Sequence, residues 1–138
     1  LRAQTEGRVL VVVGAGGDRD SAKRPIMGAE AACGADVVII TDDNPRSEVP
    51  SEIRAAVVAG AKEAVASGKA SSDTVVEEIG DRGQAIRRVV ELAHSGDSIV
   101  VAGKGHETGQ DIGGVIHPFD DREQLAEALT QRLEGSAD

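Results

Sequence analysis

The sequence predicts an α/β domain in which a mostly parallel β-sheet is covered by helices. Short β-branched runs alternate with longer, alanine-rich segments along all 138 residues, and alternation at this spacing implies parallel strands with right-handed crossovers. The chain has one Phe and no Trp or Tyr. Its core must therefore consist of Val, Ile, Leu and Ala, which suits a parallel sheet between helices. The length predicts a single domain.

Four short apolar runs are the predicted parallel strands. They cover residues 8–13, 36–41, 74–79 and 98–102, and a small hairpin is predicted to pair residues 110–112 with residues 115–118. Predicted helices lie between them, at residues 25–33, 51–68, 81–94 and 122–133.

The helix ends are predicted from local capping signals. Pro25 suits the first turn of the first helix, and Gly34 can supply a left-handed cap after its last turn. Ser51 can cap the second helix, and Asp81 with Gln84 forms a capping-box pattern at the start of the third.

Charge and composition exclude several classes of partner. The net charge of −9 argues against nucleic acid, because a phosphate backbone attracts surplus Lys and Arg, and the lack of aromatic platforms argues against single strands. Cys33 is the only cysteine, which permits no internal disulfide and fits a reducing compartment. The sequence shows neither a signal-peptide pattern nor an apolar run of about 18 residues, so we expect a cytoplasmic protein without a membrane partner.

The loop after the second predicted strand places opposite charges close together. Asp43 and Arg46 lie three residues apart in the segment Asp43-Asn44-Pro45-Arg46, at the edge where an open α/β sheet exposes its ligand-binding loops. Pro45 restricts Asn44 to extended geometry. Both charge signs at a fixed separation suit a zwitterion such as an amino acid, and the adjacent Asp42 adds negative potential suited to an ammonium or a metal. An Asx-type turn is the alternative interpretation.

The loop after the first strand, Gly14 to Asp20, is neither a Walker A loop nor a dinucleotide fingerprint. Its glycines would let backbone N–H groups approach an anion, with Arg19, Lys23 and Arg24 adding positive charge. A tight turn with solvated charges explains the glycines equally well. Arg19 lies between Asp18 and Asp20, and flanking acids can hold a guanidinium in place for a ligand carboxylate.

The loop after the fourth strand, Gly103 to Glu107, again mixes charges. Glu107 is the candidate carboxylate for a ligand ammonium, while Lys104 could neutralise a phosphate or balance Glu107. No partner at triad spacing accompanies His106, so it is assigned no general-base role.

Taken together and in this order, these loops resemble the C-terminal domain of the Mur ligases, and within that family its diaminopimelate-adding branch. The matching segments are Gly16-Gly17-Asp18-Arg19-Asp20, Lys23-Arg24-Pro25, Met27-Gly28, Thr41-Asp42-Asp43-Asn44-Pro45-Arg46 and Ala102-Gly103-Lys104-Gly105-His106-Glu107. The resemblance spans nearly the whole chain. It implies a Rossmann-like, six-stranded sheet with five parallel strands and one antiparallel strand.

The resemblance also implies a function. Such a protein is an ATP- and Mg²⁺-dependent ligase that joins meso-diaminopimelate to the D-glutamate γ-carboxyl of UDP-N-acetylmuramoyl-L-alanyl-D-glutamate through an acyl phosphate, in peptidoglycan precursor synthesis. The UDP-binding N-terminal domain and the central ATPase domain of such a ligase, which supplies most contacts to ATP and Mg²⁺, have no counterpart in these 138 residues. The domain alone is therefore expected to be inactive, with no catalytic residue and no metal ligand of its own.

The residue roles implied by the resemblance concern the amino-acid substrate. Arg19 and Arg46 would hold the distal carboxylate of meso-diaminopimelate, with Asp43 and Glu107 facing the ammonium. Asn44, Pro45 and Gly103 would complete the pocket, while Lys23, Lys104 and His106 are candidates for the phosphate side. Ala22 departs from the pattern, because relatives usually carry a glycine near this position.

Three alternatives remain open at this point, and one of them is a stand-alone structural α/β domain whose charged loops are incidental. A sibling ligase that adds L-lysine would carry a residue other than Arg at position 46. A receiver-like α/β binding module also has an acidic pair and a lysine at strand ends, but there the acidic pair follows the first strand, whereas Asp42 and Asp43 follow the second.

Overall fold

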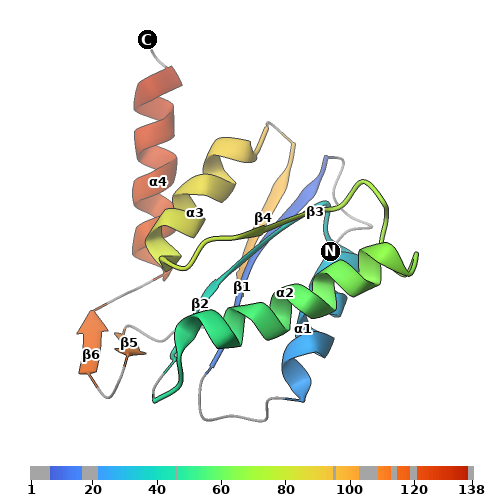
Figure 1. The fold of residues 1–138 in the computed structure, drawn as a ribbon. Helices are drawn as coiled ribbons and strands as arrows, with labels where there is room; N and C mark the ends of the chain where they lie inside the picture. The colour runs from blue at the N-terminus through green and yellow to red at the C-terminus, as the bar shows by residue number, and fades with distance from the viewer. Residues whose placement is uncertain are drawn as a thin grey trace.

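The computed structural model describes residues 7–16, 22–45, 47–94, 96–102, 109–112, 115–118 and 121–136. Strands and helices alternate through most of this length (Figure 1). The elements are β1 (Val9–Ala15), α1 (Lys23–Gly34), β2 (Val37–Asp42), α2 (Pro50–Ala66), β3 (Val75–Glu78), α3 (Arg82–Leu92), β4 (Ser98–Ala102), β5 (Gly109–Ile112), β6 (Val115–Pro118) and α4 (Asp121–Ser136).

The main sheet has four strands in the order β3-β2-β1-β4, and all of its pairings are parallel. The predicted α/β class is confirmed, as is each predicted strand and helix to within a few residues at its ends. In the described part of the chain, however, the sheet does not have the six strands that the resemblance implied. β5 and β6 pair only with each other, antiparallel, as the hairpin that the sequence predicts, and they form a separate two-stranded sheet.

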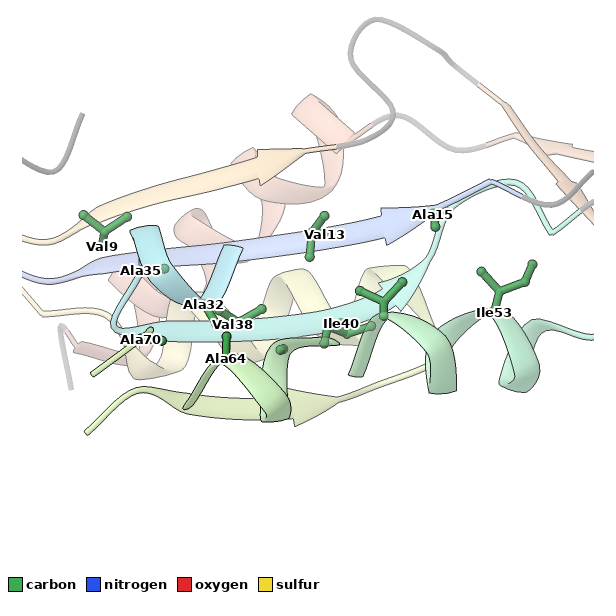
Figure 2. Packing of buried hydrophobic residues seen from close by; sticks show 12 residues of the cluster. Val9, Val13, Ala15, Ala32, Ala35, Val38, Ile40, Ile53, Ala64 and Ala70 are labelled. Atoms are coloured by element: carbon green, nitrogen blue, oxygen red, sulfur yellow. The ribbon is translucent and has the colours of Figure 1, made fainter. Parts of the chain in front are cut away.

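Each face of the sheet carries its own apolar core, because successive strand residues point to opposite sides. On one face α1 and α2 pack over Val13, Val38 and Ile40, together with small helix residues such as Ala64 (Figure 2). On the other face α3 and α4 cover a second cluster of side chains. Its members are Leu10, Val12, Val37, Ile39, Ala85, Ile86, Val89, Val90, Ala93 and Ala128. No helix in the described ranges is both long enough and apolar enough to cross a membrane.

Two of the predicted helix ends are confirmed. The Asp81 side chain accepts a hydrogen bond from the Gln84 backbone N–H at 3.1 Å, and Pro25 lies in the first turn of α1.

The other two predicted helix ends are wrong. α2 begins at Pro50 rather than after Ser51, because proline lacks the N–H that a first helical residue leaves unsatisfied. Gly34 is still helical, and the extended Ala35 ends α1. The chain turns directly into β2 there, and the Asp36 backbone N–H donates to the Val9 carbonyl at 2.8 Å.

Helices α1 and α2 cross at unusually close range, where each contributes a glycine. A Cβ on Gly60 would overlap the backbone of Pro25, and a Cβ on Gly28 would overlap the Val57 carbonyl. In both cases the obstacle is backbone, which cannot rotate away as a side chain can. This crossing therefore depends on glycine at both positions.

We predict that Gly60→Ala destabilises the fold by about 3 kcal/mol, because the added methyl overpacks a backbone contact. Denaturant unfolding would measure the change. Gly34→Ala is the matched control: the added Cβ meets nothing within 4 Å on a helical residue, so this change should be neutral or stabilise by up to about 1 kcal/mol. Equal effects of the two substitutions would contradict the close crossing.

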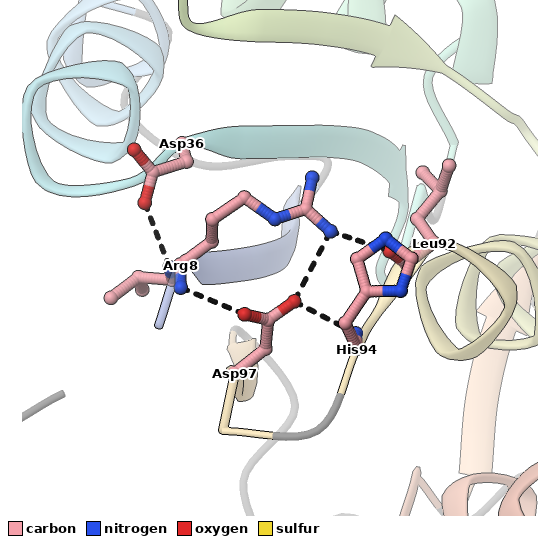
Figure 3. Close-up of polar contacts among 6 residues, drawn as sticks. Arg8, Asp36, Leu92, His94 and Asp97 are labelled. Atoms are coloured by element: carbon pink, nitrogen blue, oxygen red, sulfur yellow. Dashed lines mark hydrogen bonds and ion pairs between the residues drawn. The ribbon is translucent and has the colours of Figure 1, made fainter. Parts of the chain in front are cut away.

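A network of hydrogen bonds connects the amino ends of neighbouring strands in the sheet (Figure 3). The Asp97 carboxylate accepts hydrogen bonds from the backbone N–H groups of Arg8 and His94, both at 2.8 Å, and from the Arg8 guanidinium at 3.1 Å. The same guanidinium donates to the Leu92 carbonyl at 2.6 Å, near the end of α3. The Asp36 carboxylate accepts a hydrogen bond from the backbone N–H of Val9, the first residue of β1, at 2.9 Å. These bonds join β1 to the segments that begin β2 and β4.

The hydrogen bonds from the backbone N–H groups of His94 and Arg8 lower the pKa of Asp97, and the Arg8 guanidinium adds to the effect. A lowered pKa stabilises the fold above the unfolded value of about 3.9, and this stabilisation is lost as the pH falls through the folded value.

We therefore predict that Asp97→Asn costs about 2 kcal/mol near pH 7, and that this difference from wild type shrinks as the pH falls below the unfolded value of about 3.9 toward the lowered folded value, because the wild-type carboxyl is then progressively protonated. Denaturant unfolding across this pH range would measure it, with the exposed Asp73→Asn as the control. A cost that is independent of pH would contradict the assignment.

Candidate functional site

At the carboxyl edge of the sheet, the three predicted loops begin from neighbouring strands. β1 lies between β2 and β4, and the register pairs Ala15 with Asp42 and Val13 with Ala102. Residues 16–22, 43–49 and 103–108 therefore leave from the ends of three adjacent parallel strands. The strand order reverses between β1 and β4, and in open α/β sheets such a switch point is where ligands bind.

Gly14 lets the ends of β1 and β2 approach closely. A Cβ at this position would lie 2.9 Å from both the Asp43 backbone nitrogen and the Thr41 carbonyl oxygen. Such contacts are shorter than real Cβ atoms make, so a side chain here would separate the two strand ends.

Of the predicted substrate-binding residues, the structure describes Asp43, Asn44 and Pro45. All three are buried directly after β2, with Asp43 and Asn44 only 7% and 6% exposed. The candidate phosphate-side residue Lys23 is exposed at the first position of α1. The remaining predicted site residues lie outside the described residues, and their roles stay predictions. They are Arg19, Arg46, Gly103, Lys104, His106 and Glu107.

Asp42 does not add negative potential for a ligand, contrary to the sequence-based interpretation. Its carboxylate pairs with the Arg54 guanidinium of α2 at 2.6 Å, and Arg54 also reaches Glu78 at the end of β3 at 2.9 Å. Burial raises the pKa of Asp42, and the hydrogen bond and charge of Arg54 oppose that shift. Asp42 thus joins β2 to α2 within the domain.

Arg24 likewise has a different role from the one expected. Its guanidinium is buried and makes a two-pronged ion pair with Glu48, at 2.7 and 3.1 Å. It also donates to the Gly16 carbonyl at 3.3 Å. Its charge is therefore balanced by Glu48 instead of being presented to an anion. Arg24 ties the glycine-rich loop to the segment that follows Arg46.

Arg82 is the residue at this edge that sequence reasoning missed. Its side chain, 1% exposed, donates to the carbonyls of Asp42 at 3.2 Å and Ala102 at 3.0 Å. One signal was available: Arg82 is the first residue of α3, where the helix dipole disfavours a cation. A cation at such a position needs a specific acceptor nearby.

Among the described residues, no group of three or more His, Cys, Asp or Glu side chains could hold a metal ion. A Mg²⁺ ion is often held by only one or two carboxylates together with substrate phosphates, so no Mg²⁺ ligand is assigned to this part of the chain.

Comparison with known proteins identifies the family. A family model described as "Mur ligase, glutamate ligase domain" matches residues 1–105. The chain belongs to this Mur ligase family. The match includes all four strands of the main sheet and the first two predicted site loops of this Mur ligase domain.

Among individual proteins, the chain is similar to ligases with one particular name. The chain is 61% identical over 135 residues to the UDP-N-acetylmuramoyl-L-alanyl-D-glutamate–2,6-diaminopimelate ligase of Corynebacterium glutamicum, covering 96% of this chain and 25% of that protein. The protein of the same name from Corynebacterium efficiens is 61% identical over 129 residues, covering 94% of this chain and 24% of that protein. The Mur ligase domain described here therefore spans about a quarter of the length of these relatives.

A solved structure agrees with the fold. The structure of a UDP-N-acetylmuramoyl-L-alanyl-D-glutamate–2,6-diaminopimelate ligase superposes with a TM-score of 0.79 at 42% sequence identity. The match covers 94% of this chain and 25% of that one. The arrangement of elements in this Mur ligase domain is thus one that a solved ligase also contains.

The pairing of Arg24 with Glu48 can be tested by a double-mutant cycle. We predict that Glu48→Ala costs about 2 kcal/mol of unfolding free energy, because it leaves a buried guanidinium without its counter-charge while Glu48 itself is partly screened by solvent. In an Arg24→Met background the same change should cost much less, because no buried cation remains.

Urea unfolding of the four proteins would give the coupling free energy. Additive effects would show that the two side chains do not depend on each other.

Proposed function

We propose that this chain is the C-terminal, amino-acid-binding domain of an ATP-dependent ligase that adds meso-diaminopimelate to UDP-N-acetylmuramoyl-L-alanyl-D-glutamate in peptidoglycan precursor synthesis. The observation that carries the proposal is the β2-β1-β4 arrangement, which starts all three charged loops from adjacent strand ends in a Mur ligase domain. The names of the similar relatives, at 61% identity, support the choice of amino acid.

The proposed pocket matches the charges of meso-diaminopimelate, which carries an ammonium and a carboxylate at each end. Arg19 and Arg46 would hold the distal carboxylate, and Asp43 and Glu107 would receive the ammonium. The burial of Asp43 supports this assignment, because a charged hydrogen bond is stronger where water is excluded. Asn44, Pro45 and Gly103 would complete the walls.

Binding at the distal end would select against L-lysine, which has no distal carboxylate. In a lysine complex the Arg46 guanidinium would be left without its partner, and a site built around such a polar contact rejects the deficient substrate strongly. The lysine-adding alternative therefore becomes an outcome of the experiment below. Family membership removes the support for a receiver-like module.

The rest of the reaction is assigned to segments beyond this chain. ATP would activate the D-glutamate γ-carboxyl for attack by the amino group that this domain presents. We propose that a UDP-binding N-terminal domain and a central ATPase domain of the same cytoplasmic protein supply the ATP and Mg²⁺ contacts, with Lys23, Lys104 and His106 as candidates on the phosphate side. The isolated domain would then have no ligase activity.

The decisive experiment measures phosphate release by the full-length ligase with each amino acid. We predict a kcat/KM for meso-diaminopimelate that exceeds the value for L-lysine by roughly 10⁴-fold. Arg46→Ala should lower the meso-diaminopimelate value by at least about 10²-fold and leave the lysine value nearly unchanged, because lysine makes no contact with Arg46.

Arg87→Ala, which removes an exposed arginine of α3, is the matched control and should behave like wild type. Equal turnover of both amino acids by the unmutated enzyme would overturn the proposed selectivity.

A further inference from the structure

We propose that Arg82 is a positioning residue for the amino-acid pocket. Its buried guanidinium connects the last peptide groups of β2 and β4 and so sets the spacing between the Asp43–Arg46 loop and the Gly103–Glu107 loop. This inference rests on the proposed function, because it concerns the pocket that the two loops are expected to form.

The contacts of Arg82 join two strands that do not pair. β2 and β4 are separated by β1 in the sheet, so backbone ladder bonds couple their ends only through β1. The Arg82 Nη1 and Nη2 atoms bridge this gap by donating to the Asp42 and Ala102 carbonyls, at 3.2 and 3.0 Å. A guanidinium is planar and its donors are fixed relative to one another, so the two carbonyls are held at a defined separation.

Both acceptors belong to peptide groups that open the predicted site loops. The Asp42 carbonyl shares a rigid, planar peptide unit with the nitrogen of Asp43, and the Ala102 carbonyl shares one with the nitrogen of Gly103. Fixing each carbonyl therefore fixes the direction in which the backbone enters each loop. Asp43 and Gly103 are themselves proposed pocket residues, so the effect of Arg82 reaches the site within one peptide bond.

Stability alone gives little reason for an arginine here. The side chain is 1% exposed, and taking a guanidinium out of water carries a large desolvation cost. It also begins α3, at the end of the helix dipole that repels cations. Well-packed apolar residues often replace buried ions without loss of stability, so stability does not require a charged side chain at this position. What arginine alone supplies is a rigid guanidinium whose two N–H donors can reach both carbonyls.

The test compares Arg82→Lys, Arg82→Ala and the control Arg88→Ala in the full-length ligase. Arg88 lies on the same helix but pairs with Glu77, away from both strand ends. KM and kcat are measured separately for the amino acid, ATP and the UDP-linked substrate, together with the melting temperature.

We expect Arg82→Lys to melt close to wild type and to raise KM for the amino acid, so that kcat/KM for the amino acid falls roughly 10- to 100-fold, because a displacement of about 1 Å in the pocket costs this much. KM for ATP and for the UDP-linked substrate should stay unchanged. Methylguanidinium should partly restore Arg82→Ala, whereas methylammonium should not. Arg88→Ala should match wild type.

Several results would overturn the proposal. If both Arg82 variants melt far below wild type, or lose kcat with unchanged KM for all three substrates, Arg82 serves folding only. Full activity of Arg82→Lys would show that a point charge suffices. If the wild-type enzyme prefers another amino acid, the proposed function fails instead. The same comparison is then run with the preferred amino acid, so the two failures are distinguished.

Discussion

The parallel register of β1 between β2 and β4 is the constraint on which the functional edge depends. It places Ala15 opposite Asp42 and Val13 opposite Ala102, so three loops that are far apart in the sequence begin from adjacent strands at the same edge of the sheet. Gly14 permits this arrangement where β1 approaches the backbone after Thr41. The same register keeps β1 and β2 side chains on the correct faces, because a slip of one residue would exchange the two cores.

Three arginines stabilise this edge of the sheet through contacts within the domain, although an arginine near a charged loop can resemble a ligand-binding residue. Arg24, Arg54 and Arg82 each connect separate elements through carboxylates or backbone carbonyls. Their charge is thus used inside the domain. Residues on both sides of the proposed ligand residue Arg46 are anchored in the domain. Pro45, before it, is buried, and Glu48, after it, forms an ion pair with Arg24. A loop anchored so closely at both ends suits a binding site that must distinguish similar amino acids.

Much of the fold could be predicted because its signals are local. The β-branched runs, the alanine-rich helices and the Asp81 cap depend on residues a few positions apart, and the structure contains all of them. The wrong predictions concern choices that depend on surroundings. Ser51 was a suitable cap, but Pro50 begins α2, and Gly34 was free to adopt a left-handed conformation that the direct entry into β2 does not require. The placement of the β5–β6 hairpin outside the main sheet likewise depends on tertiary packing.

By itself, the sequence determined the α/β class, the order of the elements, the family resemblance and the three loops that follow strands, because each is encoded in contiguous residues. Only the tertiary structure decided which charges are engaged within the fold. Asp42 and Arg24 have the pattern of ligand-facing groups, yet each has a partner, 12 or 24 positions away. Arg82 is not among the residues that the sequence predicts for the site, although it bridges two strand ends. An ion pair depends on the distance between side chains in space, and sequence spacing carries that information only within a single helix or strand.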